Sequence, residues 1–577
     1  MNKMIIRRDV AAAEDGLPSD LHPVLRRIYR SRELRDAREL QYSLDGLHPY
    51  TDLKDIDAAG QLLSAALQGQ KRILIVADFD ADGATSCAVA VRGLRLLGAR
   101  DVRYVVPNRF AFGYGLTPEI VAVAAQQQPE LLITVDNGIS SIEGVAAARE
   151  RGMQVLITDH HLPGDSLPDA DAIVNPNQPG DRFPSKNLAG VGVIFYVLLA
   201  LRARLREEQW FARGNIAEPN LAQLLDLVAL GTVADVVPLD YNNRILVSQG
   251  LARIRAGRCC AGIQGLLTVA GRNTRHLVAA DLGFAVAPRL NAAGRLEDMS
   301  LGIACLLSDD ATQARMMAAQ LDQLNQERRA IEAQMQEDAL VAIESLTLSE
   351  DDPGLPVGVC LFQEHWHQGV IGILASRIKD RLHRPVIAFA PANADEIKGS
   401  ARSVPGVHIR DVLDAVAAHH PGLLSKFGGH AMAAGLSLPR ENFATFSIAF
   451  DEEVRRHLAA EDLRGVIMSD GELVSEDLSL DFAELLRSAG PWGQTFPEPM
   501  FDGLFEIVNQ RVVGERHLKM VVKIPDHDKL FDAIAFNTDQ LAWLRDAARA
   551  RVAYKLDVND FRGQRSAQLL IEHLEPI

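Results

Sequence analysis

Apolar and polar positions between residues 51 and 190 alternate in a way that predicts a parallel α/β sheet. Five apolar runs have the length of strands: 72–76, 102–106, 131–135, 154–158 and 172–174. Segments with helical spacing separate them, at 84–97, 117–127 and 142–151. Strands that alternate with helices in this way form parallel sheets with helices on both faces.

Helical patterns dominate the middle of the chain. The longest apolar run, Val191–Leu201, is too short to span a bilayer and predicts a buried helix. Neither Gly nor Pro occurs between Gly302 and Pro353, and apolar residues follow helical spacing there. A single helix over 311–345 would be roughly 50 Å long. Its charged opposite face predicts a helix that connects two domains.

Two further domains follow this helix. Strand patterns near 356–362 and 385–390, with a helix near 369–381, predict a second, smaller α/β domain. Strand patterns at 504–508, 518–524, 533–536 and 552–558 predict a small β-barrel or sandwich. The chain is therefore divided as follows: an N-terminal extension at 1–50, a first α/β domain at 51–305, a connecting helix at 306–350, a second α/β domain at 351–458 and a β-barrel domain at 459–577.

Composition sets limits on class and compartment. The 577 residues are 47% hydrophobic and 24% charged, which suits three or four globular domains. The net charge of −16 argues against a general polyanion binder but permits a local basic groove. Five cysteines without a Cys-x-x-Cys spacing favour reduced, cytosolic thiols over disulfides or a zinc site, and no signal peptide is evident. Arginines at 26, 27, 30, 32, 35 and 38 favour a solvated helical extension over a nucleic-acid arm.

An acidic loop follows the first predicted strand. Asp78, Asp80 and Asp82 precede Gly83 and lie where parallel α/β sheets place ligands. Three neighbouring carboxylates cannot all ionise unless a cation offsets their repulsion, and oxygen ligands at this density favour Mg²⁺ or Mn²⁺. An acidic turn is the alternative. A calcium-binding loop is disfavoured because Val89 stands where its final Glu should be.

Two more strands end in polar clusters. Asp136-Asn137-Gly138 follows 131–135, and Asp159-His160-His161 follows 154–158. We expect these side chains at the same end of the sheet as the acidic loop, with Asp159 as the carboxylate behind a metal-binding His. Asp235 lies in an apolar segment and needs a partner, either a cation or backbone amides.

Candidate anion contacts lie further along the chain. The segment 288–295 contains Arg289, Asn291 and Arg295, which suit phosphate, although a structural loop is an equal alternative. Two glycine-containing loops, 398–403 and 426–430, bring glycines next to basic side chains, as anion sites do; ordinary turns are the alternative.

The predicted barrel has residues that suit a groove for a single strand. They combine basic and ring side chains: His517, Lys519, Lys523, Lys555, Phe561, Arg562 and Arg565. An ordinary charged barrel surface is the alternative.

The motifs around Asp80, Asp136, His160 and Asp235, in this order, resemble the DHH phosphoesterase superfamily. Lys426–Ala431 looks like the associated C-terminal domain of that superfamily. A more specific resemblance appears when these motifs are combined with the segments 107–109, 189–192 and 288–295. Nearly the whole chain then resembles the bacterial single-strand-specific 5′-to-3′ DNA exonucleases of this superfamily, which end in an OB-like barrel.

The resemblance implies two divalent cations, Mn²⁺ or Mg²⁺. Asp80 would hold one cation and Asp82 the other, with Asp136 as the bridge. His160 and Asp235 would complete the second site, and Asp78 would support the loop or reach the first cation. Many members of the superfamily have a His four residues before the equivalent of Asp80, where this chain has Val76. This departure puts the ligand set of the first cation in question.

The implied reaction is in-line hydrolysis of a DNA phosphodiester by a hydroxide that the cations activate beside Asp136, with release of a 5′-mononucleotide. His161, backed by Asp159, would contact the phosphate or assist protonation. The residues expected to contact the substrate are Arg109, Arg289, Asn291, Arg295, Ser400, Arg402, Gly428, Gly429 and His430.

The resemblance also implies a cytoplasmic monomer that acts on single-stranded DNA in recombination and in mismatch and excision repair. Its expected partners are a single-strand-binding protein and a RecQ-type helicase. Two alternatives stay open. One is a phosphodiesterase of the same superfamily that acts on short oligonucleotides or cyclic dinucleotides, or a pyrophosphatase; the other is a non-catalytic single-strand-binding scaffold.

Overall fold

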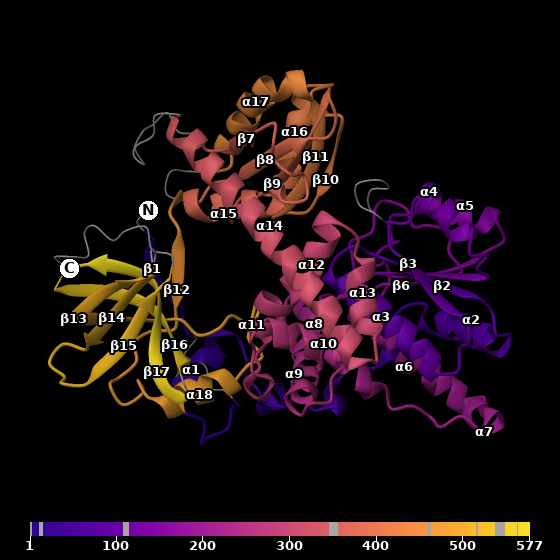
Figure 1. Cartoon of the computed structure of the whole chain (residues 1–577), viewed down its shortest axis with the longest axis horizontal. Coiled ribbons are helices and arrows are strands. Elements are labelled where there is room, and N and C mark those ends of the chain that lie inside the picture. The colour runs from indigo at the N-terminus through magenta and orange to yellow at the C-terminus, as the bar shows by residue number, and fades with distance from the viewer. Residues whose placement is uncertain are drawn as a thin grey trace.

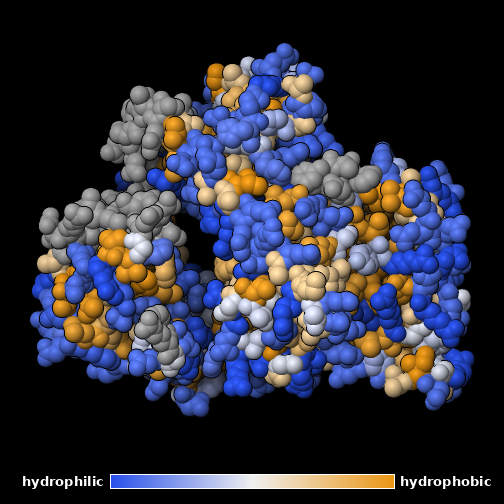
Figure 2. Space-filling model, viewed as in Figure 1, coloured by the Kyte–Doolittle hydropathy of each residue, from blue (hydrophilic) through white to orange (hydrophobic). Residues whose placement is uncertain are grey.

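The computed structural model describes residues 3–10, 16–107, 115–345, 356–458, 463–514, 517–536, 548–561 and 563–577. Two α/β domains and a barrel surround an open centre (Figure 1). The first domain leads through a long helix, α14, to the second, and the barrel lies on the other side of that helix. Figure 2 shows that the space between the barrel and the two α/β domains is open in this view.

The first domain contains a five-stranded parallel sheet with the strand order β3-β2-β4-β5-β6. The strands are β2 (Ile73–Ala77), β3 (Val102–Val105), β4 (Leu131–Val135), β5 (Gln154–Thr158) and β6 (Ala172–Val174). Strands β2 and β4 are buried throughout because helices cover both faces of the sheet, which explains their unbroken apolar sequences. The predicted parallel sheet is confirmed.

Helices cover the two faces of this sheet. These helices are α2 (Ile56–Gln68), α3 (Ala81–Leu96), α4 (Pro118–Ala125), α5 (Ile142–Glu150) and α6 (Gly190–Glu207). Helices α3 and α6 are almost wholly buried, as their small and apolar residues require. The expected buried helix over Val191–Leu201 is therefore confirmed as part of α6. The described residues contain no helix that is long and apolar enough to cross a membrane.

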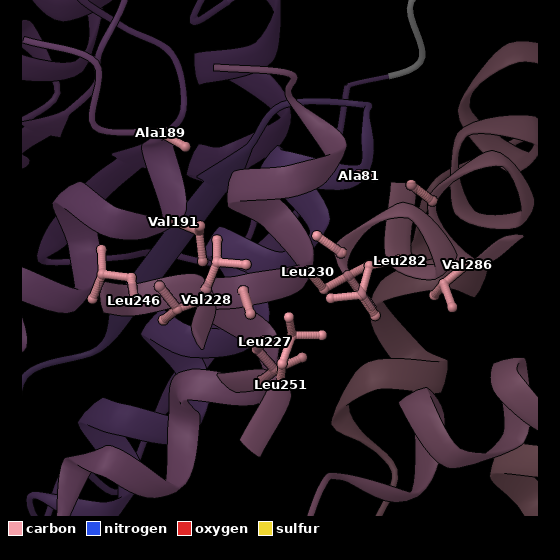
Figure 3. Packing of buried hydrophobic residues seen from close by; sticks show 14 of the residues in the cluster. Ala81, Ala189, Val191, Leu227, Val228, Leu230, Leu246, Leu251, Leu282 and Val286 are labelled. Atoms are coloured by element: carbon pink, nitrogen blue, oxygen red, sulfur yellow. The ribbon is translucent and has the colours of Figure 1, made fainter. Parts of the chain in front are cut away.

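A helical layer joins the first sheet to the rest of the molecule. It consists of α8 (Leu225–Ala234), α9 (Tyr241–Arg255), α10 (Ala261–Val269), α11 (Ala279–Asp281), a π-helical turn (Leu282–Val286), α12 (Ala287–Leu296) and α13 (Ser300–Leu307). The short helix α7 (Trp210–Gly214) instead packs against α6 at the outer edge of the first domain (Figure 1). The segment 288–295 therefore belongs to helix α12 and is not a loop. Figure 3 shows part of the packing in this layer, where α8 meets α6, α9 and the π-helical turn.

The long helix α14 (Ala311–Ser345) matches the prediction and leads into the second α/β domain. The sheet of this domain has the order β10-β11-β9-β8-β7. Its strands are β7 (Val359–Phe362), β8 (Val386–Pro391), β9 (Glu396–Arg402), β10 (Lys426–Gly429) and β11 (Ala433–Pro439), with helices α15 (Ile371–Leu382), α16 (Ile409–His419) and α17 (Phe443–Arg455).

The two glycine-containing segments of this domain are strands, which corrects the prediction of loops. Segment 398–403 lies mostly in β9 and segment 426–430 mostly in β10. In β9, Ile397, Gly399 and Ala401 alternate on the buried face with partly exposed residues on the other. The alternation of buried and exposed positions that marks a strand is weak in this sequence, because glycines interrupt the pattern of apolar residues.

The C-terminal part contains a closed barrel with the order β13-β14-β15-β17-β16. Its strands are β13 (Phe501–Val513), β14 (His517–Lys523), β15 (Leu530–Ala535), β16 (Arg549–Phe561) and β17 (Gln564–Pro576), and α18 (Leu480–Ser488) packs against β16 and β17. The predicted barrel is confirmed, although the sequence patterns did not indicate β17.

The N-terminal extension is fastened to the segment before the barrel, which corrects the prediction of a solvated helix. Strand β1 (Met4–Arg7) pairs in parallel with β12 (Val466–Ser469), and α1 (Pro23–Ser31) follows it. The buried guanidinium of Arg32 donates two hydrogen bonds to Asp470, at 2.6 and 2.9 Å. Arg32 looks solvated in the sequence because its carboxylate partner lies 438 residues away.

Candidate metal centre and active site

Three adjacent strands deliver the acidic side chains to one edge of the first sheet. Asp78 and Asp80 follow β2, Asp136 follows β4 and Asp159 follows β5, and these strands are neighbours in the order β2-β4-β5. Because the strands are parallel, their carboxyl ends lie at the same edge. Asp235 reaches this edge from the C-terminal end of α8.

The ligand-type atoms of these residues converge. Within the described residues, three sets of side chains offer atoms that lie within 4.8 Å of one another: Asp78, Asp80 and Asp136; Asp82, His160 and Asp235; Asp136, His160 and His161. The sets overlap at Asp136 and His160. This arrangement has room for two cations, with Asp136 able to reach both.

His160 lies between carboxylates of different strands. Its Nε2 atom is 3.1 Å from Oδ1 of Asp136 and 3.5 Å from Oδ2 of Asp235, yet neither contact has hydrogen-bond geometry. A buried ring nitrogen without a hydrogen bond is costly unless another group, such as a metal ion, completes it. Imidazole and carboxylate together suit Mn²⁺ and, with weaker preference, Mg²⁺. The donor set therefore fits divalent cations.

Asp82 has a second role that its sequence position did not indicate. Its two carboxylate oxygens accept hydrogen bonds from the backbone N–H groups of Gly190 and Val191, at 2.7 and 3.0 Å. These groups form the N-terminus of α6, which favours a negative charge. Asp82 therefore anchors α6 while it also lies within reach of His160 and Asp235.

Burial and mutual repulsion raise the pKa values of the carboxylates. Burial, followed by the charge of Asp80, raises the pKa of Asp82 to about 7. Burial, followed by the charge of Asp82, raises the pKa of both Asp136 and Asp235 well above its usual value. Protons occupy these groups in the folded chain when no cation neutralises them, so the metal-free site resists full ionisation.

His160 and His161 have opposite shifts despite being neighbours. Burial, with the nearby charge of His161, lowers the pKa of His160 to about 4, so this ring is neutral and able to bind a metal. Burial also opposes the charge of His161, but its hydrogen bond to Asp159 and the negative charges around it outweigh burial and raise its pKa to about 9. His161 is therefore cationic at neutral pH.

These shifts set the direction of the pH dependence of the metal-free protein. Groups with raised folded pKa values bind more protons when folded, so their contribution to stability is lost as the pH rises through those values. This holds for the carboxylates Asp82, Asp136 and Asp235, and for His161. The lowered pKa of His160 has the opposite effect on stability, but only between its folded pKa of about 4 and the ordinary pKa of about 6.5. Above pH 6.5 the stability of the metal-free protein should therefore fall.

Asp159 orients His161. Its Oδ1 accepts hydrogen bonds from the backbone N–H of His161 at 3.1 Å and from Nδ1 of the ring at 2.8 Å, while Oδ2 accepts from Ile139 N–H. These bonds fix the position and orientation of the His161 imidazole at the metal centre. Asp159 thus lies behind the imidazole of His161, the pairing that the resemblance implied.

Several residues that shape the site were not predicted. The side-chain amides of Asn175 and Asn177 donate to the backbone carbonyls of His161 and His160, at 2.9 and 2.6 Å. Asn137, which was expected at this edge, donates from its side-chain amide to the carbonyls of Val76 and Val135 and so links β2 to β4. The Asn-Pro-Asn sequence after β6 was the available signal, since it stands at the same edge of the sheet.

Val76 offers no ligand, as its sequence position suggested. Its side chain is fully buried in the apolar cluster on one face of the first sheet, with Leu74 and Leu132. Any first cation is therefore left to the oxygen ligands of Asp78, Asp80 and Asp136.

The three predicted contacts in α12 have structural partners. Arg289 pairs with Asp322 of α14 at 2.7 Å. Asn291 Oδ1 accepts from Ala81 N–H at 2.8 Å, at the first turn of α3. Arg295 donates to the carbonyl of Gly369 at 3.3 Å, which links α12 to the second α/β domain. These contacts brace the acidic loop and both domains, and direct contact with DNA stays a prediction.

The predicted contacts in the second α/β domain form a continuous strip. Gly428, Gly435 and Ser400 are cross-strand partners in β10, β11 and β9. A Cβ atom at Gly428 or Gly435 would meet nothing within 4 Å, so bare backbone faces open space there. Gly429 lies beside Gly428 and has a φ of 151°.

His430 connects this strip to the metal centre. Burial, followed by the charge of His161, lowers the pKa of His430, which places the two rings within electrostatic reach of each other. Arg109 lies outside the described residues, as does Arg562 of the proposed barrel groove.

Comparison with known proteins supports these features. Residues 72–232 match the model of the DHH family, N-terminal domain, residues 354–456 the DHHA1 domain and residues 469–573 the RecJ OB domain. The single-stranded-DNA-specific exonuclease RecJ of Dickeya dadantii is 58% identical over 578 residues, which cover 100% of both chains. The protein of that name from Escherichia coli is 54% identical, with 99% of each chain covered.

Solved structures agree. The structure of RecJ from Thermus thermophilus in complex with Mn²⁺ has a TM-score of 0.79 and 30% identity, covering 100% of this chain and 79% of that one. The Mg²⁺ complex from the same organism has a TM-score of 0.74 and 28% identity, covering 100% of this chain and 78% of that one. With near-complete coverage at more than half identity, this chain belongs to the RecJ family of single-stranded-DNA-specific exonucleases.

Proposed function

We propose that this protein hydrolyses single-stranded DNA stepwise from the 5′ end and releases 5′-mononucleotides. The observation that carries the proposal is the convergence of Asp80, Asp136, His160 and Asp235, from four distant parts of the chain, within reach of common cations. Scattered positions would have excluded such a site. Membership of the RecJ family supports the choice of single-stranded DNA as the substrate.

Two divalent cations fit the donor set, with Asp78 and Asp80 as ligands of one, Asp82, His160 and Asp235 as ligands of the other, and Asp136 shared. When bound, such cations lower the pKa of water and stabilise the attacking and leaving oxygens of a phosphodiester. Asp136 is buried with a φ of 63°, an uncommon backbone conformation that turns its carboxylate toward both sets of ligands.

His161 supplies a positive charge beside the scissile phosphate. Its ring is held by Asp159 through Nδ1, and the protonated imidazole would contact a phosphate oxygen or assist protonation of the leaving 3′-oxygen. The side chain remains about one-third exposed, so a substrate can reach it. The raised pKa supports a protonated ring at neutral pH.

The 5′ end is selected in the second α/β domain. The guanidinium of Arg402 donates to Ser400 Oγ and to the carbonyl of Ala401, and burial lowers its pKa. No carboxylate pairs with it among the described residues. A partly buried guanidinium whose partners are neutral is well suited to a phosphate.

The N-terminus of α15 lies against Arg402. A Cβ atom at Gly372 would lie 2.9 Å from Nη2 of Arg402 and 3.0 Å from Ser400 Oγ, so only a glycine leaves this corner open. Backbone N–H groups at a helix N-terminus and a guanidinium together favour an anion. The 5′-terminal phosphate would sit in this corner, and the glycine strip beside it would allow the DNA backbone to approach closely.

The decisive experiment is digestion of one single strand labelled at either its 5′ or its 3′ end, with Mn²⁺, Mg²⁺ or a chelator. The proposal predicts immediate release of the 5′ label as a mononucleotide, late release of the 3′ label, and no reaction with the chelator. Early release of the 3′ label would exclude the proposed polarity, and digestion in the chelator would exclude the metal centre.

The closed barrel argues against the small-substrate alternatives. Short oligonucleotides, cyclic dinucleotides and pyrophosphate need no barrel, whereas the open centre of the molecule gives a long strand a path past it (Figure 2). Turnover that rises with strand length would favour the exonuclease.

The protein would act in the cytoplasm, as a monomer, in recombination and in mismatch and excision repair. A single-strand-binding protein and a RecQ-type helicase would supply and present its substrate. Family membership alone supports these roles. Binding of the purified chain to each purified partner, measured with and without a single strand, tests them.

A further inference from the structure

Two exposed apolar side chains directly follow residues of the candidate metal centre, and a third lies on the turn that packs against α8; we call the three the apolar rim. Phe284 is 79% exposed, Val236 is 62% exposed and Leu162 is 60% exposed. Leu162 directly follows His161, and Val236 directly follows Asp235. Adjacent residues are about 3.8 Å apart, so these two side chains begin within a few ångströms of the charged cluster.

Phe284 joins the rim through the π-helical turn. Its neighbours Leu282, Ala285 and Val286 are buried, and Figure 3 shows Leu282 and Val286 in the packed cluster with Leu230 of α8. A Cβ atom at Gly283 would lie 3.2 Å from Cγ1 of Val233, so the turn contacts the end of α8 that leads to Asp235. Phe284 is therefore exposed on a turn that packs against α8 two residues before Asp235.

The local backbone at the rim is unusual in two places. Val236 has a φ of 61°, a conformation that β-branched residues rarely adopt, and burial of its side chain does not compensate for it. The π-helical turn is the other, and such turns occur frequently at functional sites. The strained backbone and the exposed apolar surface together indicate that these side chains contact a ligand and do not pack in the hydrophobic core.

We propose that the apolar rim stacks against unpaired bases next to the scissile phosphodiester, with Phe284 as the principal contact, and that it thereby determines the preference for single strands. The inference rests on the proposed function. Every base has an apolar face, so stacking accepts any sequence. A duplex keeps those faces inside the helix and presents mainly phosphates and groove edges, which the rim cannot bind.

Substitution of Phe284 tests this contact. Phe284→Ala should raise KM for a single strand about ten-fold, equivalent to about 1.4 kcal/mol, while kcat changes little. Phe284→Trp should keep KM near the wild-type value because it keeps an aromatic face. Ile448→Ala, at a 63% exposed position of α17, is the matched control and should have no effect. Thermal melting of each variant verifies folding.

Strands with one abasic site, moved through the first four positions from the 5′ end, distinguish stacking from a structural role. The wild type should lose activity at one or two of these positions, and Phe284→Ala should show no further loss there. An equal abasic penalty in both proteins, or an unchanged KM in Phe284→Ala, would refute the proposal. Failure of the wild type to digest an intact single strand would instead refute the proposed function.

Discussion

Gly190 is the position where the smallest substitution should disturb the metal centre most. A Cβ atom there would lie 2.6 Å from Oδ1 of Asp136 and 2.7 Å from its Cβ. The same residue donates its backbone N–H to Asp82 at 2.7 Å. Gly190→Ala therefore inserts a methyl group between the first turn of α6 and the carboxylate that is shared by both proposed cation sites.

The structure sets the size of the effect. Asp136 would have to retreat by roughly 0.5–1 Å to regain ordinary contact, and overpacking of this kind costs about 1–3 kcal/mol of stability. Asp136 cannot rotate away easily, because its backbone has a positive φ and both neighbours are buried. A displacement of about 1 Å in a catalytic group lowers the rate by about 10²-fold. We expect Gly190→Ala to lose about that factor in kcat.

The assay measures release of mononucleotides from a 5′-labelled single strand in Mn²⁺, together with strand binding and thermal melting. Gly164→Ala is the matched control, because Gly164 is exposed, three residues from His161, and a Cβ atom there would meet nothing within 4 Å. Binding should persist in Gly190→Ala, since the second α/β domain and the barrel are unchanged. A kcat within three-fold of the wild-type value in a folded Gly190→Ala protein would refute the proposed position of Asp136.

Three further predictions concern the cations and the 5′ end. Asp136→Ala should abolish cleavage but retain single-strand binding by fluorescence anisotropy; normal digestion would show that the shared ligand is misassigned. In chelator, the melting temperature should fall as the pH rises from 7 to 9, because the raised pKa values of the buried carboxylates and of His161 make deprotonation unfavourable in the folded state. Mn²⁺ should restore more stability at the higher pH. Parallel curves of melting temperature against pH with and without Mn²⁺ would contradict this linkage. Arg402→Ala should reduce any preference for a 5′-phosphate over a 5′-hydroxyl by roughly ten-fold or more. The control Arg315→Ala, on the exposed surface of α14, should not change this preference. An unaltered preference in Arg402→Ala would show that Arg402 does not bind the 5′-phosphate.

Local sequence patterns were sufficient for the first sheet and the long helix. The unbroken apolar runs of β2 and β4 predict strands because both faces of a parallel sheet are covered, and the Gly- and Pro-free stretch after Gly302 predicts α14. The polar residues after each strand could be assigned to one edge for the same reason. This regularity is local in sequence, so a reader of the sequence alone can find it.

Contacts between distant residues could not be predicted. Arg32 looked solvated because Asp470, its partner, is far along the chain, and β1 pairs with a strand more than 450 residues later. The strands β9 and β10 were not predicted, because their glycines resembled those of anion-binding loops. In the structure these glycines belong to the strands of the sheet. The pairing of Arg289 with Asp322 of α14 is another contact that the sequence did not indicate, while contact of Arg289 with phosphate stays a prediction.

The sequence by itself determined which chemical groups stand at the ends of the strands, because side-chain chemistry and strand length are properties of short segments. Only the tertiary structure decided how those groups divide their roles: Asp82 is both helix anchor and candidate ligand, His160 is neutral and His161 is cationic. It also placed Arg402 of the second domain, partly buried, among neutral partners. The reason is physical. Burial and the charges of neighbours set each pKa and each partner, and both depend on residues that the fold, not the order of the chain, brings together.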